Sequence, residues 1–211
     1  MNLVYRIVHA LLAAAVFPAV IFLQLFYMEV SPNFIDYGVS LEFSLYQIFD
    51  LFGGGGKTSS LRSAFSKESL SNIWSVFAGS HASLVLMVAS GVITLELTVF
   101  VIVACIVKGN RKVLLSASSA GLVTSILFKV FSAQVCRTVT AGEVDIVKIF
   151  SQSFVAGFLG DLISVDTLRI GAFSNAVLIL FICMVIWSVI YIVTDIGLEE
   201  EKPAAPAKKK K

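Results

Sequence analysis

The sequence has few charged residues, few histidines and few cysteines, and each shortage excludes a class of function. Only 14% of the 211 residues are Asp, Glu, Lys or Arg, whereas soluble domains carry about a quarter. So few charges exclude an ordinary soluble enzyme and a nucleic-acid-binding module, and a formal net charge of +2 gives no basis for binding a polyanion. The two His and three Cys form no closely spaced set of ligands, so we expect no metal and no cofactor.

Hydrophobic residues, in contrast, make up 57% of the chain, and the mean hydropathy is +0.91. A helix that crosses a hydrocarbon core needs about 20 apolar residues, and four runs are long enough. They cover about residues 7–28, 83–107, 113–135 and 172–193. The runs do not alternate as barrel strands do. The sequence therefore predicts an all-α integral membrane domain over residues 1–197, with four transmembrane helices. Pro18 should kink the first helix or free one of its carbonyls.

The distribution of Lys and Arg predicts the orientation, because cytoplasmic loops carry an excess of both. The short loop 108–112 has three positive charges and no acid, whereas segments 29–82 and 137–171 each carry more acids than basic residues. We expect both termini in the cytoplasm of a plasma-membrane protein; the final lysines leave an endoplasmic-reticulum location as the lesser alternative. The Lys-rich tail, residues 198–211, is predicted to be disordered. Its lysines either attract anionic lipid or form a solubilising tail that helps to fix the topology.

The two outer segments are predicted to contain short amphipathic elements. Residues 39–45 alternate with the period of a strand, whereas residues 46–52 are more typical of a helical turn, and we favour an interfacial helix over a strand here. Apolar side chains recur at helical spacing from Ile146 to Leu162, which predicts a second such helix. The run Gly53–Thr58 ends in Gly-Lys-Thr but lacks the earlier Gly of a phosphate-binding loop, so we interpret it as a hinge.

Two ionisable residues lie well inside the predicted spans, Glu96 in the second and Lys129 in the third. Counted from the short loop, they lie about 16 Å and 24 Å along antiparallel helices, and their side chains lean toward each other. Each needs a partner or a wet cavity, because a charge at the bilayer centre costs about 2.5–3.5 kcal/mol. We therefore expect an intramembrane charge pair. It either fixes the register of the two helices or lines a path for a proton or solute.

Other residues of the spans are candidates for a polar network and for helix packing. Gln24 and Gln134 could extend the network around the charge pair. His9 could also join it, but its position beside Arg6 near the cytoplasmic edge is more typical of an interfacial residue. Small residues that let helices approach closely recur every four positions in the third span, at Ala117, Gly121 and Ser125. We expect this face to point into the bundle.

No motif of a hydrolase or metalloenzyme is present, so the chain is not expected to be an enzyme. Four spans with larger outer segments resemble claudins and tetraspanins in topology only, since the paired Cys of the one and the Cys-Cys-Gly of the other are missing. The sequence favours a non-catalytic accessory, scaffold or interaction subunit, in contact with the lipid bilayer and with a partner protein or further copies of itself. The alternative is a small oligomeric channel or transporter with Glu96 and Lys129 lining its path.

Overall fold

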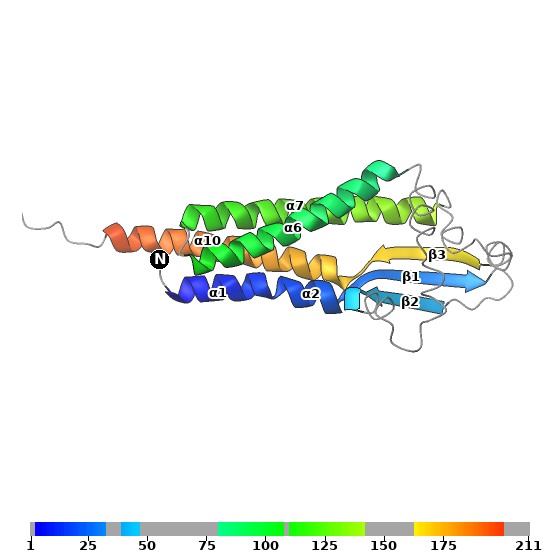
Figure 1. The fold of residues 1–211 in the computed structure, drawn as a ribbon, viewed down its shortest axis with the longest axis horizontal. Coiled ribbons are helices and arrows are strands. Elements are labelled where there is room, and N and C mark those ends of the chain that lie inside the picture. The colour runs from blue at the N-terminus through cyan, green and yellow to red at the C-terminus, as the bar shows by residue number, and fades with distance from the viewer. Residues whose placement is uncertain (1–2, 33–38, 47–79, 108–109, 142–162, 201–211) are drawn as a thin grey trace, which may run out of the picture.

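The computed structural model describes residues 3–32, 39–46, 80–107, 110–141 and 163–200. In this part of the chain, four helical segments are long and apolar enough to cross a membrane. They are α1 (Leu3–Ala14) continued by α2 (Val16–Phe22), α6 (His81–Ile106), α7 (Arg111–Thr140) and α10 (Ala172–Glu200). Figure 1 shows an elongated bundle, with the N-terminus and the last turns of α10 at one end and a small sheet at the other. We refer to these as the termini end and the sheet end.

The first segment is interrupted where α1 ends and α2 begins, at Ala15. Pro18 explains the interruption, because proline has no N–H to donate to the carbonyl of Ala14 and its ring crowds that carbonyl. The backbone of Ala15 itself stays helical, with φ −66° and ψ −16°. The two helices together run from Leu3 to Phe22, 20 residues, or about 30 Å.

The predicted end of this span at residue 28 is wrong, because residues 24–28 belong to a strand. The helix stops at Leu23, whose backbone is extended, with φ −79° and ψ 154°. Strand β1 then covers Gln24–Pro32. The apolar run continues through Phe26, Tyr27 and Met28, residue types that suit a strand as well as a helix, so composition alone did not mark the change.

The sheet has three strands in the order β2–β1–β3, and both pairings are antiparallel. Strand β2 covers Val39–Ser44 and β3 covers Ile163–Ile170. In the centre of the sheet, Tyr27 of β1 lies opposite Glu42 on one side and Arg169 on the other. The chain is mostly helical, with the four long apolar helices that were predicted, but the sheet shows that the fold is not all-α. The strand predicted over residues 39–45 is confirmed for Val39–Ser44. Of the helical turn predicted over residues 46–52, only Tyr46 is among the described residues, and it is helical.

Gly171 joins the sheet to the bundle, between the end of β3 and the start of α10. Its N–H donates to the carbonyl of Leu25 over 2.7 Å. A Cβ at this position would lie 1.9 Å from the carbonyl oxygen of Gln24, so only glycine permits this approach of two backbones. The junction holds the start of β1 against the start of α10.

The other predicted spans match the helices, with two extensions. Helix α7 continues beyond residue 135 to Thr140, and its 30 residues reach about 45 Å, which is longer than a hydrocarbon core. Helix α10 continues beyond residue 197 to Glu200, so the predicted tail begins within a helix. Residues 201–211, the hinge at Gly53–Thr58 and the predicted helix at 146–162 lie outside the described residues.

The core of the bundle combines apolar side chains with small hydroxyl-bearing residues. Phe181 and Met184 of α10 are fully buried. On α6, Thr94 and Thr98 are buried and donate to the carbonyls four residues earlier, over 2.7 and 2.8 Å. These two hydroxyls are satisfied within their own helix, so they can be buried against a neighbouring helix. The buried hydroxyls of Ser80, Ser132 and Ser188, in contrast, have no hydrogen-bond partner among the described residues.

Candidate functional site

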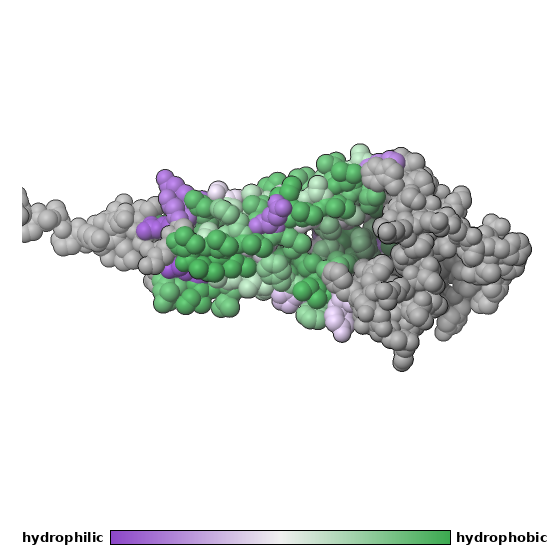
Figure 2. Space-filling model, viewed as in Figure 1, coloured by the Kyte–Doolittle hydropathy of each residue, from purple (hydrophilic) through white to green (hydrophobic). Residues whose placement is uncertain are grey.

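Glu96 lies on α6, 10 residues before the end of the helix at Ile106, or about 15 Å from it. Its side chain is exposed, and the large side chains around it on the same face, Val92, Phe100 and Val103, are exposed as well. Figure 2 shows hydrophilic atoms gathered mainly at the ends of the bundle, with one small patch over α6 near mid-length on an otherwise hydrophobic face. Glu96 therefore presents a carboxylate on an apolar outer surface.

Lys129 of α7 bonds to a different partner from the one predicted. Its Nζ donates to the Oδ1 of Asn175 on α10 over 2.6 Å. Among the described residues, no ion pair joins Lys129 to Glu96, and Glu96 forms no hydrogen bond. The structure thus does not bring the expected charge pair together.

The rotation of α6 explains why the pair does not form. Helix α6 turns its buried face, with Thr94 and Thr98, toward α7, and Thr94 Oγ1 lies 2.9 Å from Thr124 Oγ1 of that helix. Glu96 is two residues from each threonine, which places it about 200° around the helix axis. The predicted positions of Glu96 and Lys129 along the two helix axes allowed a pair, but the side chain of Glu96 points away from α7.

The two glutamines do not form one network. Gln24, at the start of β1, donates from Nε2 to the carboxylate of Glu42 on β2. Gln134 lies in the last third of α7 with an exposed side chain. Neither reaches Glu96 or Lys129 through a hydrogen bond between described residues.

The three small residues of α7, Ala117, Gly121 and Ser125, are all buried. Gly121 packs against the ring of Phe181, and a Cβ at this position would lie 2.0 Å from Cε1 of that ring. The small face therefore points into the bundle, and at Gly121 it forms a seam between α7 and α10.

A polar cluster at the termini end was not predicted. Arg6 of α1 donates from Nε to the carbonyl of Cys105 over 2.6 Å and from Nη2 to that of Ile106 over 2.7 Å. These are two of the last carbonyls of α6, which accept no hydrogen bond from an N–H of their own helix. The cationic side chain also complements the negative end of the helix dipole.

His9, one turn further along α1, is only 2% exposed. Its Nε2 lies 3.0 Å from the Oγ of Ser118 on α7. The sequence suggested an interfacial position because Arg6 is close by. A signal for burial was present, however, since His9 shares its helix face with Ala13 and Val16, at spacings of four and seven residues, and both are fully buried.

Aromatic side chains complete this cluster. The ring of Tyr5 lies 5.0 Å from that of Trp187 and 4.2 Å from that of Tyr191, measured between centroids. Trp187 Nε1 donates to the carbonyl of Tyr5 over 3.2 Å, and Arg111 lies 5.1 Å from the centre of the Tyr191 ring. The cluster joins α1, α7 and α10 and has the character of a structural clamp.

The described residues contain no group of three or more His, Cys, Asp or Glu able to hold a metal ion. Cys105, Cys136 and Cys183 are free thiols. No known protein family, curated protein or solved structure matches the chain. Among the described residues, the exposed carboxylate of Glu96 on an apolar surface is the feature that most directly suggests a function.

Proposed function

We propose that this chain is a non-catalytic membrane subunit that binds a partner protein through the α6 face around Glu96. The observation that carries the proposal is the exposed carboxylate in the middle of an apolar helix face. Within a membrane, ionisable side chains nearly always face a bundle interior or a wet cavity and are paired. Since the described part of this chain supplies no pair for Glu96, we assign that role to another chain.

The chemistry of the site defines the partner. The partner is a transmembrane helix with a Lys, Arg or other hydrogen-bond donor at the same depth, flanked by apolar side chains that cover Val92, Phe100 and Val103. The pair would form in a medium of low dielectric constant, where charge-assisted hydrogen bonds are strongest. We further propose a plasma-membrane location with the termini end in the cytoplasm, on the basis of Lys and Arg in the short loop 108–112 and in the tail.

We rank a channel or transporter below this function. A path lined by Glu96 and Lys129 requires the two side chains to share a cavity. Lys129 instead donates to Asn175 at the α7–α10 seam, and Glu96 lies on the outer surface of α6.

Purification from the native membrane in mild detergent tests the proposal, with the mass and composition of the particle as the readout. The wild-type chain should copurify with another transmembrane protein, and Glu96→Leu should reduce its recovery on the order of tenfold or more. The reason is that losing one member of a buried charge pair costs about 2–5 kcal/mol. Glu96→Gln, which keeps a hydrogen-bonding group, should retain part of the partner.

Val85→Ala is the matched control. Val85 is exposed on the same helix and lies 11 residues before Glu96, so it faces nearly the same direction. This variant should leave recovery unchanged. A particle that contains only copies of this chain, or a Glu96→Leu variant that keeps its partner, would contradict the proposed function.

A further inference from the structure

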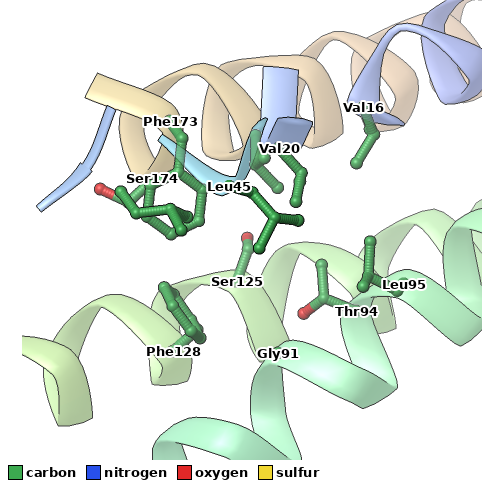
Figure 3. A pocket seen from close by; sticks show the side chains of 12 residues that line it. Val16, Val20, Leu45, Gly91, Thr94, Leu95, Ser125, Phe128, Phe173 and Ser174 are labelled. Carbon is green, nitrogen blue, oxygen red and sulfur yellow. The ribbon is translucent and has the colours of Figure 1, made fainter. Parts of the chain in front are cut away.

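A cavity of about 160 Å³ lies among the helices, near the sheet end of the bundle. Figure 3 shows side chains from two opposite sides converging on it, with Val16 and Val20 of α2 facing Thr94 and Leu95 of α6. Phe128 of α7 also lines the cavity. Its size matches that of an engineered apolar cavity, about 150 Å³, that takes up benzene. The cavity therefore has room for several carbon atoms.

The hydroxyl groups on the cavity wall all have hydrogen-bond partners within the protein. Thr94 donates to the carbonyl of Ser90 over 2.7 Å, and Ser125 donates to that of Leu122 over 2.8 Å. Ser174 donates to the carbonyl of Gly171 over 3.3 Å. Water in a cavity needs two to four polar partners. Since the wall offers few free ones, the cavity suits hydrocarbon and not water.

The position of the cavity indicates the source of this hydrocarbon. Val20 lies two residues from the end of α2 at Phe22, and Phe173 is the second residue of α10. Leu25 of β1 and Leu45, which follows β2, line the cavity on the side of the sheet. The cavity thus lies just inside the sheet end of the first and last of the segments that are long and apolar enough to cross a membrane, and beside the middle of α6 and α7. The chains of lipids whose head groups lie beside the sheet would reach this depth.

Two of the helices that line the cavity diverge at this level. Helix α6 packs along α7 but diverges from α2 toward the sheet end, as Figure 1 shows. The cavity is partly open to the surface, and it is lined by residues of both diverging helices. We infer that the cavity binds one acyl chain of a membrane phospholipid, which enters between α2 and α6 from the sheet-side leaflet. This inference does not depend on the partner-binding function.

Photolabelling tests the inference. The purified chain is reconstituted in phosphatidylcholine vesicles that contain a phosphatidylcholine with a diazirine on one acyl chain, and the labelled positions are mapped by mass spectrometry. Labelling should concentrate several-fold on residues that line the cavity, such as Leu95 and Val177, relative to outward-facing residues such as Ile179, which is 57% exposed. Equal labelling of the cavity and of the outer face would overturn the inference.

A pair of variants on α10 sharpens the test. Val177→Phe places a ring in the cavity and should reduce cavity labelling at least threefold, whereas Ile179→Phe adds the same ring to the outer surface and should not change it. Undiminished labelling in a folded Val177→Phe protein would contradict the assignment. If Val177→Phe does not fold, the wild-type labelling pattern decides alone. Cavity labelling by a diazirine sterol but not by the phospholipid would also overturn the acyl-chain assignment.

Discussion

The seam between α7 and α10 depends on the absence of a side chain at Gly121, and this leads to a sharp prediction. In Gly121→Ala, the new methyl group would lie 2.0 Å from Cε1, 2.6 Å from Cζ and 2.7 Å from Cδ1 of Phe181. All three distances are far below van der Waals contact. The ring has no free space to move into, because Phe181 is fully buried. The helices must separate, or the ring must leave its preferred rotamer.

The expected cost follows from these contacts. Overpacking a core by one methyl group costs about 1–3 kcal/mol, and a clash with a ring that has no free space to move into should reach the upper part of this range. The higher helix propensity of Ala offsets at most about 1 kcal/mol. We therefore expect Gly121→Ala to lower the free energy of unfolding by about 1–2 kcal/mol. Gly91→Ala serves as the control, because its methyl group would lie 3.2 Å from the ring of Phe128, and Phe128 borders the cavity into which it can shift.

Unfolding in detergent by titration with sodium dodecyl sulfate measures both variants. Gly91→Ala should change stability by less than about 1 kcal/mol, since its small clash and its propensity gain oppose each other. Phe181→Leu should destabilise the wild type by opening a cavity but should destabilise Gly121→Ala much less, giving a coupling energy of about 1 kcal/mol or more. Additive effects of the two substitutions, or an unchanged stability of Gly121→Ala, would refute the seam as described.

Three further predictions concern the two ends of the bundle, each measured by the same titration. Gly171→Ala should lower the free energy of unfolding by about 2–3 kcal/mol. Adding Gln24→Ala should not restore the lost stability, because the new methyl group meets the backbone carbonyl of Gln24. Restored stability would show that the side chain of Gln24 was the obstacle. Arg6→Lys should lower the free energy of unfolding by about 1–2 kcal/mol, because an ammonium group keeps the charge but lacks the planar fork that reaches two carbonyls. Stability equal to that of the wild type would contradict the role of Arg6 as a clamp. His9→Leu and Ser118→Ala should each cost about 1–3 kcal/mol by leaving a buried polar group unpaired, while the double variant should cost less than their sum.

The four helices were predictable from the sequence, because long uniform apolar runs have few alternative structures in a protein of this composition. The sheet was not. Strand β1 continues the apolar run of the first helix without a break in composition, and its partner β3 lies more than 130 residues further along the chain. Pairing at such a distance has no local signal. Only the alternation at residues 39–45 indicated a strand, and it competed with the helical pattern that follows.

The candidate site was predictable in its residues but not in its pairing. Glu96 and Lys129 were identified because a charge inside an apolar run is costly wherever it lies. The positions of the two residues along their helix axes could be estimated, because they depend only on the rise per residue, which is the same for every α-helix. The directions of the side chains depend on which face of α6 meets α7, and the hydroxyl stripe at Ser90, Thr94 and Thr98 decides this. Asn175, the actual partner of Lys129, was overlooked because an amide in a span carries no charge.

The way in which the helices are joined explains how a cavity can persist in this bundle. Helix α2 continues into β1, and β1 pairs with β3, which leads through Gly171 into α10, so the sheet ties α2 to α10. A short loop and a long seam tie α6 to α7. At the termini end, Arg6 fastens α1 to α6, but no described strand or loop directly joins α2 to α6 at the sheet end. The space between them can therefore widen or narrow around an acyl chain without breaking a backbone hydrogen bond of the sheet, which a tightly packed bundle would not allow.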